Sequence, residues 1–76
     1  MDEKKETRWN LTVHFRDKSG RDVASTRRKS CIEGLLCTVD APVVPGMEPD
    51  RKVVAVNLYN HKTVTVTYLR REEDWW

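Results

Sequence analysis

The stretch that decides the fold is residues 8–16, Arg-Trp-Asn-Leu-Thr-Val-His-Phe-Arg. Its apolar residues are Trp9, Leu11, Val13 and Phe15, and a polar residue separates each from the next. Alternation with a period of two is typical of a strand with one buried face and one face in water. The pattern therefore predicts a long strand whose apolar face contributes to the core.

A turn and a weaker strand are predicted immediately after this segment. Asp17-Lys18-Ser19-Gly20 combines turn-forming residues with a glycine suited to closing a tight loop. Residues 21–25 would then run back beside the first strand, with Val23 facing inward. Because this segment has few apolar residues, we expect an edge strand or an extended connection.

Residues 30–37 favour a short helix. Ser30 and Glu33 have the spacing of a capping box, which marks the start of a helix. A helix this short would be stable only when packed on a sheet. Its apolar stripe would consist of Cys31, Ile32, Leu35 and Leu36.

Three prolines dominate the next segment, residues 38–50, and exclude regular structure there, which predicts a structureless connection of about a dozen residues. Pro45-Gly46 suits the centre of a type II turn. Long connections without secondary structure are uncommon in small domains and are often functional. Met47, near the tip of this loop, is therefore a candidate contact residue.

Two valine-rich segments, 53–59 and 63–69, predict the last two strands. A three-residue loop at 60–62 would pair Leu58 with Val64 and Val56 with Val66, with all four side chains on one face. A two-residue loop would place the two valine rows on opposite faces. We therefore expect an antiparallel hairpin with a three-residue or bulged loop.

The predicted fold is α+β: an antiparallel sheet of three or four strands with one short helix on one face, in the order β-β-α-β-β. Residues 8–71 would form the single domain, flanked by a disordered segment at 1–7 and an acidic, tryptophan-ending tail at 72–76. The predicted core consists of Trp9, Leu11, Val13, Phe15, Ile32, Leu35, Leu36, Val54, Val56, Leu58, Val64, Val66 and Tyr68.

Composition narrows the class of protein. With 76 residues, 38% hydrophobic and 34% charged, the chain is too apolar for a disordered protein and too polar for a membrane span. The net charge of +2 conceals an uneven distribution, because residues 7–71 carry +6 between two acidic ends. A basic body attracts phosphates or acidic protein surfaces.

Cys31 and Cys37 are too few for the disulfide framework expected in a small secreted domain. We therefore expect two reduced thiols and a cytoplasmic location. Together with His14 and His61 they provide four potential zinc ligands, but their spacing matches no zinc module. No catalytic arrangement or glycine-rich phosphate loop is present in the sequence, so we expect neither a cofactor nor enzymatic activity.

The leading functional hypothesis is a small, non-enzymatic protein-binding module. Stand-alone domains of this size class include phage and mobile-element proteins that inhibit or adapt a host complex, and we expect this role by size alone. The terminal tryptophans would fold back over an open face of the sheet, anchor the partner or form a homodimer. The predicted partner-binding residues are Trp75, Trp76, Met47, Arg27, Arg28 and Lys29.

The alternative is a nucleic-acid-binding domain that uses a basic strip. The predicted hairpin of the last two strands would bring Arg51-Lys52 close to Arg70-Arg71. The basic cluster Arg27-Arg28-Lys29, before the predicted helix, would extend this strip. No aromatic side chain is left on the polar face to stack on bases. The residues of this strip would be Arg21, Arg27, Arg28, Lys29, Arg51, Lys52, Arg70 and Arg71.

Overall fold

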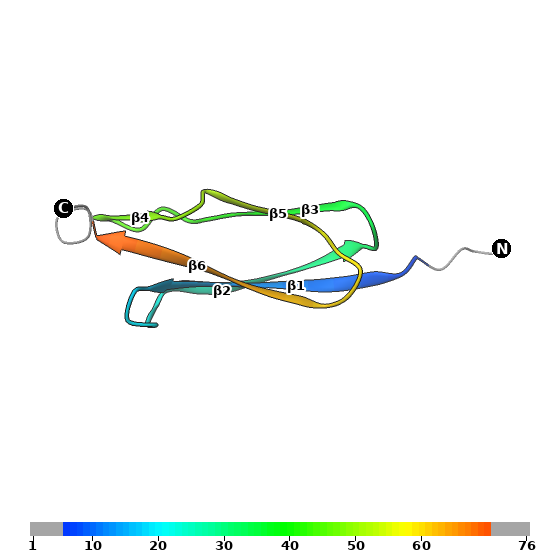
Figure 1. Cartoon of the computed structure of the whole chain (residues 1–76), viewed down its shortest axis with the longest axis horizontal. Coiled ribbons are helices and arrows are strands. Elements are labelled where there is room, and N and C mark those ends of the chain that lie inside the picture. The colour runs from blue at the N-terminus through cyan, green and yellow to red at the C-terminus, as the bar shows by residue number, and fades with distance from the viewer. Residues whose placement is uncertain (1–5, 71–76) are drawn as a thin grey trace.

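The computed structural model describes residues 6–70 and arranges them as two packed sheets (Figure 1). One sheet has four strands in the order β2-β1-β6-β4, and the other pairs β3 with β5. These residues contain no helix, and hence none that could cross a membrane. The strands are β1 Arg8–Asp17, β2 Asp22–Ile32, β3 Leu36–Asp40, β4 Met47–Pro49, β5 Val53–Asn57 and β6 Lys62–Arg70.

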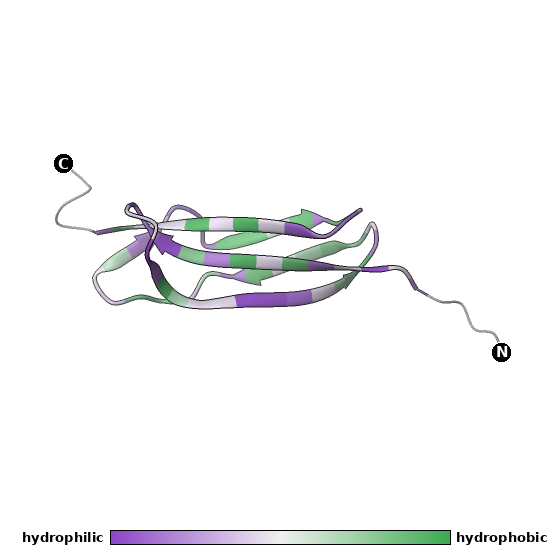
Figure 2. Ribbon diagram, turned by 90° about the horizontal axis from the view of Figure 1, so that it is seen from below, coloured by the Kyte–Doolittle hydropathy of each residue, from purple (hydrophilic) through white to green (hydrophobic). Residues whose placement is uncertain are grey.

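The alternating segment forms β1, as predicted. Leu11, Val13 and Phe15 are 0% exposed, whereas the residues between them are only partly buried. Figure 2 shows the alternation as bands of apolar and polar colour along the ribbon of the larger sheet. β1 lies between an antiparallel neighbour, β2, and a parallel neighbour, β6. The other strand pairs, β4–β6 and β3–β5, are antiparallel.

The predicted α+β fold is wrong, because residues 30–37 form strand ends and a turn instead of a helix. β2 pairs with β1 as far as Ile32, where the backbone turns sharply. The N–H of Leu35 donates to the carbonyl of Ile32 (3.2 Å), and Gly34 has a φ of +81° that helices do not use. The long β1–β2 ladder outweighs a local helical preference that is weak in so short a segment.

The expectation of reduced thiols is also wrong, since Cys31 and Cys37 form a disulfide across this turn, with their Cα atoms 5.9 Å apart. Both cysteines are buried, and the bond joins the end of β2 to β3 in the opposite sheet. Leu35 and Leu36, which a helix would have buried, are 56% and 63% exposed.

The predicted hairpin between the last two strands does not form either. β5 pairs with β3, and β6 pairs with β1, so the two strands lie in different sheets. The connection between them contains Leu58, which is 1% exposed. Both valine rows still face the core, but from opposite sides of it, because period-two alternation specifies the buried face and not the neighbouring strand.

The core fills the space between the two sheets. Phe15 of β1 and Tyr68 of β6 meet edge to face, with ring centroids 6.3 Å apart. Of the predicted core residues, Ile32, Leu35 and Leu36 are not part of the buried cluster, and Trp9, Val56 and Val64 pack at its edge. The buried cluster consists of Leu11, Val13, Phe15, Cys31, Cys37, Val39, Val54, Leu58, Val66 and Tyr68.

Both turns predicted from turn-forming residues are present. At the β1–β2 turn, the Asp17 carboxylate accepts hydrogen bonds from the Ser19 hydroxyl (2.6 Å) and the Arg21 N–H (3.0 Å), and these bonds lower the pKa of Asp17. The prediction that residues 38–50 lack regular structure is wrong, because β3 extends to Asp40 and β4 covers Met47–Pro49, where it pairs with β6. In the proline loop between these strands, the Met47 N–H donates to the Val44 carbonyl (3.1 Å). Gly46, at φ +78°, takes the position that a type II turn reserves for glycine.

Tyr68 gives the domain an expected sensitivity to alkaline pH. Its hydroxyl donates to the carbonyl of Pro42 (2.6 Å), and burial raises its pKa above the usual 10.0. Above pH 10 the phenol ionises in the unfolded chain first, so stability should fall as the pH rises further. Urea unfolding at a series of pH values measures this loss.

Tyr68→Phe is the control for this titration. The variant should be less stable by about 1 kcal/mol at pH 7, because the Pro42 carbonyl loses its donor. It should also lose less stability than the wild type between pH 10 and pH 11. Equal losses in the two proteins would show that Tyr68 does not titrate as its burial implies.

Candidate functional site

A polar depression of about 380 Å³ lies on the larger sheet, where β1, β2 and β6 run side by side. Thr12 of β1 is in register with Arg28 of β2 on one side and with Thr63 of β6 on the other. These three residues therefore form a row across the sheet, on the face away from the core. The lining residues are Asn10, Thr12, Arg28, His61, Lys62 and Thr63.

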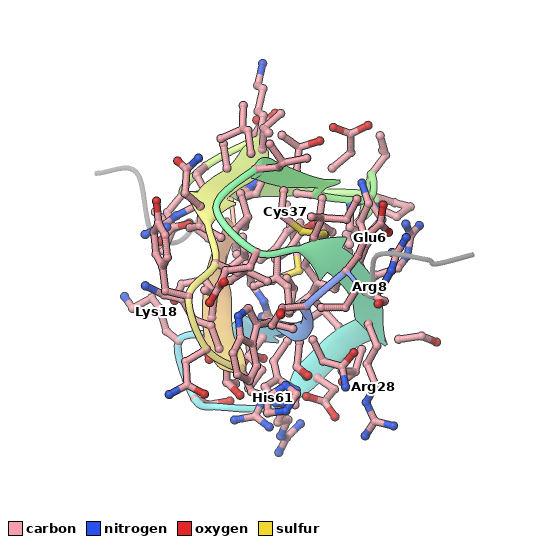
Figure 3. The ribbon with its side chains drawn as sticks, turned by 90° about the vertical axis from the view of Figure 1, so that its right-hand side faces the viewer. Glu6, Arg8, Lys18, Arg28, Cys37 and His61 are labelled. Atoms are coloured by element: carbon pink, nitrogen blue, oxygen red, sulfur yellow. A yellow bond between two sulfur atoms is a disulfide. The ribbon has the colours of Figure 1, made fainter. Side chains whose placement is uncertain are left out.

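His61 is held in a defined orientation at one end of the depression. The backbone N–H of Asn10 donates to its Nδ1 (3.0 Å), which leaves the proton of the neutral ring on Nε2. The Trp9 ring meets the imidazole edge to face, with centroids 5.1 Å apart. The Trp9 indole N–H donates in turn to the Glu33 carboxylate (3.2 Å). Figure 3 shows Arg28 and His61 on the same side of the molecule, away from the disulfide at Cys37.

The predicted basic cluster Arg27-Arg28-Lys29 lies on β2, an edge strand, and is exposed. Strand geometry sends its side chains to different faces, because Arg27 pairs with Val13 and Arg28 with Thr12. Arg27 and Lys29 face a second depression, of about 340 Å³, between β2 and β3. There the Lys29 ammonium donates to the Thr38 carbonyl (2.8 Å), and Asp40 lines the same space. Arg28 lines both depressions.

The structure separates the cations of the predicted nucleic-acid strip. Arg70 ends β6 beside β4, and Arg51 and Lys52 follow β4, whereas the basic cluster lies on β2 at the opposite edge of the sheet. Arg51 also pairs with Asp50 (3.7 Å). Arg21 belongs to the β1–β2 turn, and Arg71 lies outside the described residues.

The proline loop lines a third depression, of about 400 Å³, with mostly apolar walls. Met47, the predicted contact residue, lines it but is half-buried and packs against the core. Val43 is 94% exposed beside it. The predicted anchors Trp75 and Trp76 lie outside the described residues.

The four potential zinc ligands do not form a group. The two cysteines are bonded to each other, and Nδ1 of His14 lies 3.0 Å from the Thr26 hydroxyl. Within residues 6–70 no three metal-binding side chains come together.

The sheet topology is shared with known structures, although comparison of the sequence with family models and with curated proteins gives no match. The type 2 repeat of the mucus binding protein MUB from Lactobacillus reuteri superposes with a TM-score of 0.70 at 18% identity, over 83% of this chain. The chain spans 48% of that repeat, about half its length. A MucBP domain from Lactobacillus acidophilus gives a TM-score of 0.63 at 17% identity, with 88% of this chain and 94% of that domain covered.

The chain has the MucBP fold. A third structure, the mucin-binding domain of Spr1345 from Streptococcus pneumoniae, agrees, with a TM-score of 0.60 at 15% identity over 87% of this chain and 92% of that domain. The MucBP fold is an all-β fold, in keeping with the absence of a helix from residues 6–70.

Among the residues of the polar depression, the sequence predicted only Arg28 as a binding residue, and it named His61 only as a potential zinc ligand. The sequence predicted His61 and Lys62 in a hairpin loop, and Thr12 and Thr63 on the polar faces of the first and last strands. Their convergence depends on the parallel β1–β6 pair, which joins strands about 50 residues apart in the sequence. The sequence feature that could have indicated this site was Lys62, the basic residue next to His61.

Proposed function

We propose that this chain is a non-enzymatic binding module whose ligand is a mucin-type glycoprotein. The observation that carries the proposal is the likeness in fold to three structures whose names describe mucus or mucin binding. The polar depression is consistent with it, because hydroxyl, amide and guanidinium groups are suited to hydrogen bonding with sugars. No comparison supports the phage-inhibitor role or the nucleic-acid alternative.

The disulfide supports an oxidising location for the protein. Disulfides persist in secreted and cell-surface proteins and are rare in the cytosol. The cytoplasmic expectation rested on reduced thiols, and the Cys31–Cys37 bond removes that premise. A module that meets mucins would work in such an oxidising environment.

Binding of the full 76-residue chain to immobilised mucin tests this function. We expect saturable binding that becomes at least about tenfold weaker when the glycans are removed enzymatically, a loss of roughly 1.4 kcal/mol. The same chain unfolded by reduction and urea, then applied to the surface, provides the control for nonspecific adhesion. Absence of binding, or equal binding to the bare polypeptide, would contradict the proposal.

A further inference from the structure

We propose that the polar depression between β1, β2 and β6 binds an anionic oxygen group of a glycan, either a sulfate ester or a carboxylate. The inference rests on the proposed function and names the part of the ligand that this site recognises. It is carried by a guanidinium, an imidazole N–H and two threonine hydroxyls that line one shallow surface.

The charge of the depression is uncompensated. The Arg28 side chain lies on this face and forms no ion pair or hydrogen bond within residues 6–70. Lys62 is in register with the buried Leu11, so strand geometry sends its side chain toward the other face of the sheet. No carboxylate is among the lining residues. A guanidinium binds carboxylate and sulfate oxygens through paired hydrogen bonds. The depression therefore favours an anion over a neutral sugar hydroxyl.

The spacing suits a group of a few atoms. Adjacent strands lie about 4.8 Å apart, so the backbones of Arg28 and Thr63 are separated by about 10 Å across β1. The Thr12 hydroxyl occupies the middle of this row, with Thr63 at its far end. An oxyanion above Thr12 would lie within reach of the long Arg28 side chain.

His61 contributes a donor without requiring a positive charge. Because its Nδ1 accepts the Asn10 N–H, its Nε2–H is free to donate outward. The Trp9 ring and the Asn10 backbone hold this imidazole before any ligand arrives, which lowers the entropy cost of binding.

The neighbouring depression is a poorer anion site, although it contains more basic residues. Its Lys29 ammonium is engaged by the Thr38 carbonyl, and the Asp40 carboxylate would repel an anion. Arg28 lines both depressions, but its register with Thr12 places its side chain on the outer face, so its guanidinium belongs to the polar depression.

The test uses three versions of one N-acetyllactosamine oligosaccharide: sulfated, terminated with a sialic acid, and uncharged. We expect the full chain to bind one or both anionic forms, and the sulfated and sialylated arms identify which group is recognised. Arg28→Gln should weaken that binding about ten- to hundredfold. Arg51→Gln is the matched control, since it removes the same charge at the opposite edge of the sheet and should change affinity less than about threefold.

Two results would overturn the inference: equal affinity for the charged and uncharged oligosaccharides, or equal losses in the Arg28→Gln and Arg51→Gln variants. Failure of the inference is distinguishable from failure of the proposed function. If the Arg28→Gln variant still binds mucin as the wild type does, the mucin-binding module stands and this site is wrong. If the wild type binds the anionic oligosaccharide but not mucin, the site stands and the proposed function is wrong.

Discussion

Replacing Phe15 with alanine is expected to lower the free energy of unfolding by about 3–5 kcal/mol. Phe15 is 0% exposed and lies between the two sheets against Tyr68. Truncation removes its buried apolar surface and leaves a cavity that the flanking strands cannot fill. A domain of this size has a total stability of only about 5 kcal/mol or little more. The variant should therefore be largely unfolded at 37 °C.

Urea unfolding followed by far-ultraviolet circular dichroism measures this loss. Val43→Ala is the control, because Val43 is 94% exposed and its truncation should change stability by less than about 0.5 kcal/mol. A loss below about 1 kcal/mol in Phe15→Ala would show that the two sheets do not pack on this side chain.

Removing the Cys31–Cys37 disulfide is expected to have the second largest effect. The bond closes a short loop, with a sequence separation of 6, so the loop-closure entropy it removes from the unfolded chain corresponds to about 2–3 kcal/mol. The midpoint of thermal unfolding should then fall by about 10–20 °C on reduction. The bond also holds the β2–β3 turn against the β5–β6 connection, where the Gly34 N–H donates to the Leu58 carbonyl (2.8 Å).

Thermal unfolding with and without reductant tests this expectation. Cys31→Ala/Cys37→Ala should unfold at a lower temperature than the oxidised wild type and should not respond to reductant. A thiol assay on the denatured, unreduced wild-type chain should find no free thiol. Two free thiols in that assay, or a midpoint that reductant leaves unchanged, would contradict the structure at this turn.

The stability contributed by the disulfide bears on the proposed site. Trp9 pairs with Cys31 across the β1–β2 ladder, and its indole reaches Glu33 in the turn that the bond closes. Since Trp9 also orients His61, reduction should loosen the imidazole end of the polar depression before it affects Arg28 or Lys62.

Local chemistry made several features of this protein predictable. Alternation in residues 8–16 identified a strand and its buried face, because a strand sends successive side chains to opposite sides. The β1–β2 turn and the Pro45-Gly46 turn followed from residues that favour particular φ values. The inward faces of β5 and β6 could likewise be predicted from the alternation of their valines.

The tertiary structure alone decided which strands are neighbours. The apolar stripe at Cys31, Ile32, Leu35 and Leu36 indicates only a local helical preference. The pairing of β2 with β1 outweighed this preference. The separation of β5 from β6, the disulfide, and the approach of Arg28 to His61 and Lys62 all depend on contacts between segments distant along the chain. Side-chain periodicity records which face is buried, whereas the choice of partner depends on the packing energy of the whole molecule.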